Sequence, residues 1–556
     1  MTKNLSIALA QINPTVGDIE GNLNQIRSAR KAVHQDADLV VVGELAVSGY
    51  PPEDLVLKRA FQEAVEAGVK KLAIETDDNG PGLLIGAPWK IGDTLHNVAL
   101  MLDGGKITAV RSKVELPNYG VFDEKRVFVS GPLPGPIPFR GVRLGVMICE
   151  DMWFPEVSEC LQESGAEILV VLNGSPFESN KPDNRLSPAI ARITETGLAL
   201  AYVNLVGGQD ELVFDGGSFV LGNDKKYKAK APSWIENNLI THWSFIDDTW
   251  KCSETNITTN TDPSESVYRA LVLGLRDYVN KNGFPGVLIG LSGGIDSALS
   301  AAIAVDALGH DRVNLVLMPS PFTSKTSIKD AETTAQQLSC QLETLHINPA
   351  MDAFNSILSK PFANQKADVT EENIQARSRG IILMALSNKF GHMVLSTGNK
   401  SEMSVGYATL YGDMCGGYSV LKDIYKTTVF KLARWRNENK PDETLGPKAR
   451  GKGSIIPQNV IAKAPTAELK HDQIDQDTLP PYEELDSILN CLIEEEMSLN
   501  EIAAKGHNIK TADKIRHMLN KAEYKRRQAP PGVKITQRAF GRDRRYPLTN
   551  QFTDKV

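Results

Sequence analysis

Cysteine is scarce in this chain, and its spacing excludes a disulfide-stabilised fold. Six cysteines occur among 556 residues, and no two of them form a Cys-x-x-Cys pair. Small secreted domains carry a far denser cysteine framework than this. The sequence therefore predicts a reducing, cytoplasmic environment. The cysteines are Cys149, Cys160, Cys252, Cys340, Cys415 and Cys491.

An excess of positive charge and long apolar runs are also missing. The 61 lysines and arginines are outnumbered by 68 aspartates and glutamates, which gives a net charge of −7 and repels nucleic acid. No apolar run reaches the roughly 18 residues that a membrane-spanning helix requires. Residues 1–13 carry no long hydrophobic stretch with a cleavage site. We expect a protein that is neither exported nor inserted in a membrane and that binds no nucleic acid.

The remaining composition is that of an ordinary globular protein. Hydrophobic residues make up 41% of the chain and charged residues 23%, which excludes a disordered or fibrous protein. Domains of about 150 residues are typical, so the length allows several of them.

Apolar runs separated by helical patterns predict a first α/β domain in residues 1–246. One run contains Asp-Gly-Gly at 103–105, which is a hairpin signal. Hairpins combined with helical crossovers favour a mixed α/β sandwich over a purely parallel sheet. The runs indicate buried strands at 5–13, 38–44, 82–88, 96–110, 143–150, 167–175 and 199–208.

Residues 247–263 are polar and rich in turn-forming residues, and we interpret them as a linker. A helix is expected to follow, with Ser264 as its N-cap. From 264 to 556 strands and helices alternate strictly, which predicts a second domain with a doubly wound parallel sheet. Its strands are expected at 286–292, 313–320, 343–349 and 392–399.

The segment SGGIDS at 292–297 carries the clearest chemical signal. It follows an apolar run and opens a helix, where free backbone N–H groups stabilise an anion. Its glycines allow close approach to a phosphate, its serines can donate hydrogen bonds, and its aspartate is a hard ligand for Mg²⁺. The alternative is a Gly-rich turn that binds no ligand. The pattern Ser-Gly-Gly-x-Asp-Ser specifies five residues and rarely occurs by chance, which disfavours this alternative. The spacing also differs from that of kinase-type and dinucleotide-binding loops.

Cys149 marks a second candidate centre at the end of a predicted strand. A buried cysteine is most often inert packing, but strand ends hold catalytic side chains rigidly beside a cleft. Three histidines occur in the first 260 residues, and none lies in a segment typical of cysteine hydrolases. Glu44 and Lys113 also end predicted strands. They could act as the base for the thiol and as the cation that stabilises developing negative charge.

Residues 292–297 resemble the loop of the ATP pyrophosphatase family, whose members adenylate an oxygen of the substrate and release pyrophosphate. Further segments at 371–380, 396–414, 421–423 and 465–469 are similar to NAD synthetases. The C-terminal YKRRQAPPGVKITQRAFGRDRRYP resembles the form of those enzymes that is fused to a glutaminase. The resemblance implies ATP and deamido-NAD as substrates and Mg²⁺ as cofactor.

This resemblance also implies individual site residues. The implied ATP contacts are Ser292, Gly293, Gly294, Ile295, Asp296, Ser297, Thr397, Lys422 and Thr466. The implied deamido-NAD contacts are Asn373, Arg377, Glu402 and Lys525, and the implied Mg²⁺ ligands are Asp296 and Glu402. Taken singly, Arg377 and Arg379 could form a solvated helix face, and Asn373 or Thr397 could be caps or turn residues.

Residues 1–245 resemble the glutaminase branch of the nitrilase superfamily. Glu44, Lys113 and Cys149 follow its Glu, Lys, Cys order within GELAVSGYPPEDL, KVELPNYGVFDE and GVMICEDMW. The resemblance implies an α-β-β-α sandwich, a covalent thioester and a homo-oligomer. It further implies that Tyr119, Ser175 and Lys181 bind glutamine. Taken singly, Glu44 and Lys113 would be interpreted as surface or ion-pair residues.

The two resemblances imply complementary chemistry, because a glutaminase releases ammonia and an adenylating domain consumes it. Together they predict glutamine-dependent amidation of deamido-NAD, which would make the protein an amide-forming ligase. The first alternative is another glutamine amidotransferase with the same ATP loop, such as a GMP synthetase. The second is a metabolite-binding protein whose sites have decayed.

Overall fold

The computed structural model describes residues 3–179, 182–259, 261–439, 455–470, 475–477, 479–550 and 552. The chain divides into two compact units, Met1–Thr261 and Asp262–Val556. Each unit has its own sheets and its own core. No helix in the described ranges is both long enough and apolar enough to cross a membrane.

The first unit contains two mixed sheets. The seven-stranded sheet has the order β15-β14-β1-β2-β3-β4-β5, and the six-stranded sheet has the order β13-β12-β9-β8-β7-β6. The first sheet comprises β1 (Asn4–Gln11), β2 (Leu39–Val42), β3 (Gly82–Ile91), β4 (Thr94–Asp103), β5 (Lys106–Ser112), β14 (Asn237–Ile246) and β15 (Thr249–Cys252). The second comprises β6 (Ile137–Phe139), β7 (Val142–Ile148), β8 (Ile168–Asn173), β9 (Leu200–Asn204), β12 (Phe219–Leu221) and β13 (Tyr227–Lys230). A short hairpin pairs β10 (Val206–Gln209) with β11 (Leu212–Asp215).

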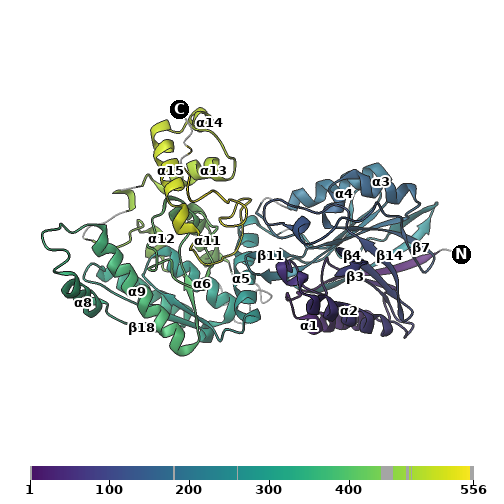
Figure 1. The fold of residues 1–556 in the computed structure, drawn as a ribbon, viewed down its shortest axis with the longest axis horizontal. Coiled ribbons are helices and arrows are strands. Elements are labelled where there is room, and N and C mark those ends of the chain that lie inside the picture. The colour runs from purple at the N-terminus through teal and green to yellow at the C-terminus, as the bar shows by residue number, and fades with distance from the viewer. Residues whose placement is uncertain are drawn as a thin grey trace. The chain divides into compact units, whose positions relative to one another are not determined.

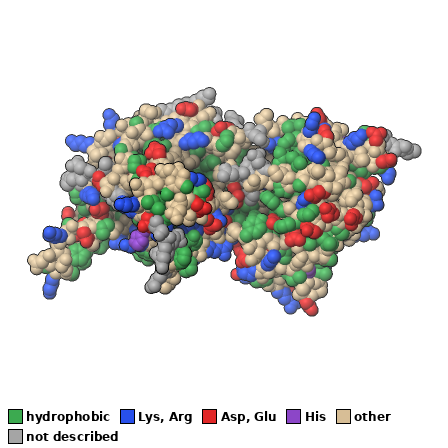
Figure 2. All heavy atoms as spheres, turned by 90° about the horizontal axis from the view of Figure 1, so that it is seen from above, with side chains coloured by type: hydrophobic (Ala, Val, Ile, Leu, Met, Phe, Trp, Pro, Cys, Tyr) green, Lys and Arg blue, Asp and Glu red, His purple; other side chains and the backbone are tan. Residues whose placement is uncertain are grey.

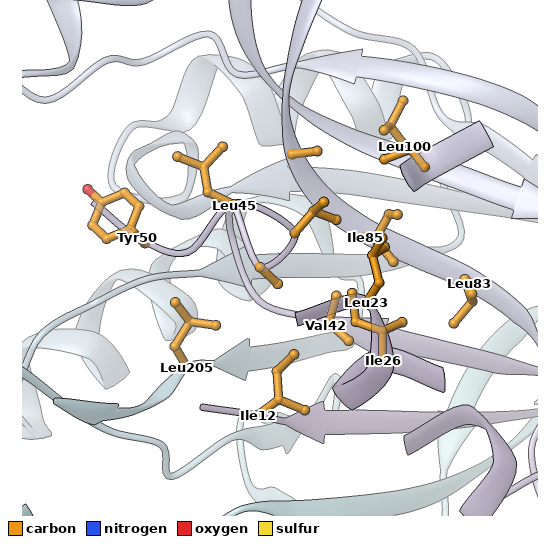
Figure 3. Packing of buried hydrophobic residues seen from close by; sticks show 14 of the residues in the cluster. Ile12, Leu23, Ile26, Val42, Leu45, Tyr50, Leu83, Ile85, Leu100 and Leu205 are labelled. Carbon is orange, nitrogen blue, oxygen red and sulfur yellow. The ribbon is translucent and has the colours of Figure 1, made fainter. Parts of the chain in front are cut away.

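Helices cover the outer face of each sheet, with α1 and α2 on one side of the unit and α3 and α4 on the other (Figure 1). Alternation along β1 explains the layering, because Ile7 and Leu9 pack in the core between the sheets while Ala8 and Ala10 face the helical layer. Figure 3 shows Leu23 and Ile26 of α1 in one cluster with strand residues such as Val42 and Ile85. The α-β-β-α sandwich is therefore confirmed. The helices are α1 (Ile19–Ala32), α2 (Arg59–Ile74), α3 (Pro155–Glu163) and α4 (Pro182–Thr196).

The segment 247–263, which we expected to be a linker, contributes to the first unit. Its β15 pairs with β14, and Ile257 bridges to Lys230 of β13. The division between the units falls after Thr261. Asp262 rather than Ser264 caps the following helix, because its carboxylate accepts the free N–H groups of the first turn at 2.8 and 3.2 Å.

The second unit is built on a five-stranded sheet of order β18-β17-β16-β19-β20 whose neighbouring strands all run parallel. Leu383 of helix α9 packs on one face of this sheet, and α6 and α11 associate with α5. The doubly wound parallel sheet is thus confirmed. The central strand β16 has β17 on one side and β19 on the other, so the chain changes direction across the sheet at β16. Ligands typically bind at the carboxyl ends of the strands at such a point.

The elements that build the sheet region are α5 (Pro263–Lys281), β16 (Val287–Gly290), α6 (Ile295–Leu308), β17 (Val313–Leu317), α7 (Lys325–Leu338), β18 (Gln341–Thr344), α8 (Asn348–Leu358), α9 (Val369–Phe390), β19 (Met393–Ser396), α10 (Lys400–Val405), β20 (Tyr418–Ser419), α11 (Lys426–Glu438) and α12 (Gln458–Ala462). The C-terminal helices are α13 (Tyr482–Ile493), α14 (Leu499–Ala504), α15 (Ile509–Lys521) and α16 (Glu523–Arg526). Helices α13 to α15 share an apolar cluster and stand together in Figure 1. Figure 2 shows acidic and basic side chains interspersed on the face seen from above.

Candidate active sites

Cys149 lies where β7 ends and a 3₁₀ turn, Cys149–Met152, begins. Its φ of 47° is in the left-handed region, so the chain turns sharply at the cysteine. The side chain is 4% exposed. Burial raises the pKa of the Cys149 thiol well above its usual range, Glu44 raises it further, and Lys113 opposes them. The thiol is therefore neutral at pH 7 and needs a base before it can attack.

Glu44 and Lys113 meet in the interior of the first unit. Both side chains are fully buried, and Lys113 Nζ lies 2.7 Å from Glu44 Oε1. The same oxygen accepts a hydrogen bond from Asn97 Nδ2 at 2.8 Å, and Oε2 accepts one from the backbone N–H of Gly174 at 3.1 Å. The charges of Glu44 and Lys113 both act on the thiol of Cys149. The structure thus brings the three predicted residues together.

Glu124 completes this buried cluster, although the sequence reasoning assigned it no role. Lys113 Nζ lies 2.9 Å from each Glu124 carboxylate oxygen, and Tyr50 donates its hydroxyl to the same carboxylate at 3.0 Å. Burial raises the pKa of Glu124 to about 7, with Lys113 opposing and Glu44 adding to the rise. Glu124 lies in the segment that resembled the nitrilase superfamily, but several acids there look alike in sequence.

Asp151 holds two parts of this site together. Its carboxylate accepts hydrogen bonds from Val114 N and Glu115 N at 3.0 and 2.8 Å, and from Ile148 N at 3.0 Å. It therefore ties the backbone beside Lys113 to the turn that carries Cys149. Burial raises the pKa of Asp151 to about 6.

The residues predicted to bind glutamine fall in different settings. Tyr119 is 56% exposed, and its hydroxyl donates a hydrogen bond to the carboxylate of Glu150 at 2.9 Å. Glu150 is the residue that follows Cys149 in the chain. Ser175 is buried in the loop that follows β8. Lys181 lies outside the described residues.

The phosphate-loop candidate of the second unit joins β16 to α6, as the sequence predicted. Gly293 has a φ of +80°, and a Cβ there would lie 2.2 Å from the backbone oxygen of Ser327. Only glycine permits that approach. The hydroxyls of Ser292 and Ser297 lie 3.1 Å apart, and Ser297 also donates to the carbonyl of Gly294 at 3.0 Å. These contacts brace the loop at the N-terminus of α6.

A pocket opens beside the loop. Its wall combines the loop with Arg379 of α9, the end of β17 and the segment 463–469. The predicted ATP residues that line it are Ser292, Gly294, Ile295, Asp296, Ser297, Thr397 and Thr466, and Glu402 joins them. Burial lowers the pKa of Arg379 to about 10, with Glu468 opposing, so its guanidinium remains charged at pH 7.

Lys426 bridges the two carboxylates predicted to bind Mg²⁺. Its Nζ lies 2.5 Å from Asp296 Oδ2 and 2.8 Å from Glu402 Oε1. Burial alone would lower the pKa of Lys426, but Asp296 and Glu402 raise it well above its usual range. Burial raises the pKa of Glu402 to about 7, with Lys426 opposing. Asn399 donates to Asp296 Oδ1 at 2.8 Å and accepts the N–H of Glu402 at 3.0 Å.

The carboxylates of Asp296 and Glu402 both contact the ammonium group of Lys426. Two carboxylates this close together also fit a shared Mg²⁺ ion, which prefers oxygen ligands. Within the described part of the chain, no cluster of three or more histidine, cysteine, aspartate or glutamate side chains could hold a metal. A magnesium ion held by these two carboxylates would take its further oxygen ligands from phosphates and water.

Lys422 is not among the residues lining the pocket. It is buried, and Lys426, four residues later in the first turn of α11, lines the pocket instead. The segment LKDIYK contains both lysines. The sequence of this segment does not show which of the two lysines lies near the loop 292–297, because that depends on the path of the chain between β20 and α11.

The remaining predicted deamido-NAD residues gather around segment 406–410. Asn373 accepts the hydroxyl of Thr409 at 2.9 Å, and Arg377 Nε donates to the carbonyl of Leu410 at 3.2 Å. Lys525 Nζ donates to the carbonyls of Gly406 and Ala408 at 2.8 and 2.7 Å. The structure brings these three residues to one segment, whereas Glu402 faces the pocket.

Comparisons with known proteins match both units. The carbon-nitrogen hydrolase family matches residues 6–244, and the NAD synthase family matches residues 267–529. The chain is 46% identical over 556 residues to the glutamine-dependent NAD(+) synthetase of Rhodobacter capsulatus, with all of both chains covered. It is 44% identical to that of Xanthomonas campestris, with 99% of this chain and 98% of the relative covered.

A solved structure supports the same assignment. The glutamine-dependent NAD(+) synthetase of Acinetobacter baumannii, in complex with adenosine diphosphate, is 41% identical and matches with a TM-score of 0.77, and all of both chains is covered. Each of these three proteins is more than 40% identical to this chain and covers at least 99% of it. The chain therefore belongs to the family of glutamine-dependent NAD(+) synthetases.

Proposed function

We propose that this protein makes NAD by ATP-dependent amidation of deamido-NAD and obtains the ammonia from glutamine. The observation that carries the proposal is the presence of two sites with complementary chemistry on one chain. One is the buried cluster of Cys149, Glu44 and Lys113. The other is the loop 292–297, whose Asp296 contacts Lys426, which in turn contacts Glu402. The family match over the whole chain supports the pairing.

In the first unit, Cys149 Sγ attacks the carboxamide carbon of glutamine while Glu44 takes the thiol proton. Lys113 stabilises the negative charge that develops on the carboxamide oxygen. The carbon–nitrogen bond then breaks, Glu44 returns the proton to the leaving nitrogen, and NH₃ departs. Water, deprotonated by Glu44, hydrolyses the thioester to glutamate and restores the thiol. Glu124 and Asn97 keep Lys113 and Glu44 oriented through these steps.

In the second unit, the backbone N–H groups of loop 292–297 bind the phosphates of ATP. A carboxylate oxygen of deamido-NAD attacks the α-phosphorus, and pyrophosphate leaves. NH₃ then attacks the carbonyl carbon of the adenylate, AMP departs and the nitrogen loses a proton. Asp296 and Glu402 would hold Mg²⁺, which would neutralise negative charge on the phosphates.

Substrate contacts are part of the proposal. We assign glutamine recognition to Tyr119, Ser175 and Lys181, and deamido-NAD recognition to Asn373, Arg377, Glu402 and Lys525. ATP contacts are assigned to residues 292–297, Thr397 and Thr466. Lys426 replaces Lys422 as the lysine assigned to the phosphates, because its Nζ lies beside Asp296.

Both alternatives lose support. The charged groups that act on the Cys149 thiol are Lys113 and the carboxylates of Glu44, Glu150 and Glu124, whereas GMP synthetase-like enzymes pair their loop with a Cys-His-Glu glutaminase. A decayed binding protein would have no reason to retain the buried ion pairs of both sites, since buried charges without a function are costly.

The test is to supply the full-length protein with ATP, Mg²⁺ and ammonium and to compare two acceptors. NAD should form from deamido-NAD far faster than GMP forms from xanthosine monophosphate. Equal rates would show that the acceptor is misassigned. The pyrophosphate released should equal the NAD formed.

We also propose that the protein is a cytoplasmic homo-oligomer. No disulfide joins any of the six cysteines, all of which the structure describes, and this suits a reducing compartment. Nitrilase-like domains usually associate. Light scattering of the full-length chain tests whether the protein is a homo-oligomer, and a monomeric mass at micromolar concentration would refute that.

A further inference from the structure

The loop 173–177 after β8 forms one wall of the glutaminase cluster. The carbonyl of Asn173 accepts the N–H of Glu44 at 3.2 Å, and the N–H of Gly174 donates back to the Glu44 carboxylate at 3.1 Å. Ser175, the next residue, is assigned above to glutamine recognition. The conformation of this loop therefore bears on both the base and the substrate contact.

Arg185 holds the loop from behind. It lies in the first part of α4 and is 7% exposed. Its Nε donates to Ser175 Oγ at 3.1 Å, and its Nη2 donates to the carbonyls of Ser175 and Pro176 at 2.8 and 3.1 Å. One guanidinium thus engages three acceptors on two consecutive loop residues, and a lysine could not match that planar arrangement of donors.

Asp215 at the end of β11 holds the guanidinium in place. Its Oδ2 accepts Nη1 of Arg185 at 2.9 Å, and its Oδ1 lies 2.8 Å from Nη2. Burial alone would lower the pKa of Arg185, but Asp215, together with Tyr202 and Glu178, raises the pKa above its usual range. The side chain remains a cation within the protein interior.

Two neighbours complete the arrangement around Ser175. Asn204 accepts the N–H of Ser175 at 3.0 Å and donates to its carbonyl at 3.2 Å. Tyr202 of β9 hydrogen-bonds the Ser175 side chain. The backbone and the hydroxyl of Ser175 are therefore both held, and Arg185 is the charged member of that set.

We propose that Arg185, oriented by Asp215, is a positioning residue for glutamine recognition, because it fixes Ser175 and the adjoining loop in the conformation that receives the amino-acid end of glutamine. The proposal rests on the proposed function. A buried ion pair by itself is weak evidence of a stabilising role. Here Nε and Nη2 of the guanidinium both donate to the loop, at Ser175 and at the carbonyl of Pro176.

The first experiment compares glutamine-dependent and ammonium-dependent NAD synthesis in the full-length protein. Arg185→Gln should raise the KM for glutamine by about 10- to 100-fold, as expected when hydrogen bonds to a charged group are lost. Ammonium-dependent synthesis should stay within about twofold, because it bypasses glutamine. Arg185→Lys keeps the charge and should fall between Arg185→Gln and the wild type. Thr194→Ala, an exposed position on the same helix, is the matched control.

The second experiment separates positioning from general stability by alkylating Cys149 with two reagents. One is iodoacetamide, which has no amino-acid end, and the other is a glutamine-shaped chloroketone. Arg185→Gln should slow the chloroketone about tenfold or more and leave iodoacetamide nearly unchanged. Equal slowing of both reagents, or an unchanged KM for glutamine, would overturn the proposal. If Arg185→Gln does not fold, the same criteria apply to Arg185→Lys.

The result is distinguishable from failure of the proposed function. If the wild type makes no NAD from ammonium and deamido-NAD, the function is wrong. The alkylation experiment still reports whether Arg185 governs recognition of a glutamine-shaped molecule at Cys149.

Discussion

Cys149 owes its chemistry to the charges packed around it rather than to exposure. Its thiol pKa is raised first by burial and then by the negative charge of Glu44, while Lys113 lowers it. Glu44 therefore has two opposite effects. It disfavours the free thiolate, yet in the proposed mechanism it is the group that removes the proton.

Glu44→Gln separates these effects. Removing the negative charge should lower the pKa of the thiol, so the pH at which iodoacetamide alkylates Cys149 at half its maximal rate should shift downward. Glutamine hydrolysis should nevertheless fall by about 10²- to 10⁴-fold, because the general base is gone. Alkylation rates across a pH series, compared with hydrolysis by the same sample, check this. A pH midpoint that moves upward would contradict the electrostatic account.

Asn399 performs two tasks with one amide. Its oxygen caps α10 by accepting the N–H of Glu402, which leaves its NH₂ group to donate to Asp296. Asn399→Ala should destabilise the second unit by about 1 kcal/mol, whereas Asn399→Ser keeps the cap and should cost less. Both variants lose the contact to Asp296, so both should lose ammonium-dependent NAD synthesis. Thermal denaturation and the synthesis assay check the two effects, and wild-type synthesis by Asn399→Ser would contradict the second.

At the scale of elements, the turn from β16 into α6 illustrates how backbone geometry builds a site. Its two glycines are not equivalent. Gly293 has a positive φ and nearly touches the backbone of Ser327 at the start of α7, whereas a Cβ on Gly294 would meet Ser292 Oγ at 3.3 Å.

Gly293→Ala should therefore destabilise the second unit by about 1–2 kcal/mol from its left-handed backbone alone, and the clash with Ser327 adds to that cost. Gly294→Ala should leave stability nearly unchanged. Glutamine hydrolysis, which belongs to the first unit, should survive in both variants. Urea denaturation of the pair checks the prediction, and equal stability would contradict it.

At the scale of the whole molecule, the two candidate sites lie in two units with separate cores. In the proposed mechanism, Cys149 serves glutamine hydrolysis, whereas loop 292–297 serves adenylation. A defect in one unit should therefore be bypassed by supplying the intermediate that the other unit needs.

Cys149→Ala is the direct test. The change leaves packing nearly intact, at a cost of about 1–2 kcal/mol at a buried site. Glutamine-dependent NAD synthesis should fall by several orders of magnitude, while synthesis from added ammonium should stay near the wild-type rate. The two rates are measured on one preparation. Retained glutamine-dependent synthesis would exclude Cys149 as the nucleophile, and loss of both activities would indicate a structural role.

Features that depend on residues close together in the chain could be predicted from the amino-acid sequence. Cys149 follows a buried strand and SGGIDS joins a strand to a helix, as the apolar runs predicted. A hairpin signal among apolar runs in the first domain and strict strand–helix alternation in the second were sufficient to predict the two sheet classes, because both patterns report how neighbouring elements connect.

Features that depend on residues far apart in the chain could not be predicted in this way, because folding brings those residues together. Lys113 meets Glu44 across 69 residues of sequence and Lys426 meets Asp296 across 130. Among several similar acids and lysines, the fold selected Glu124 as the second partner of Lys113 and Lys426 rather than Lys422 as the lysine at the loop. The sequence patterns did not point to Arg185, because its proposed role depends on hydrogen bonds to the carbonyls of Ser175 and Pro176, which only the fold brings close. The choice between chemically equivalent side chains depends on which one the packing turns inward, and local sequence patterns do not carry that information.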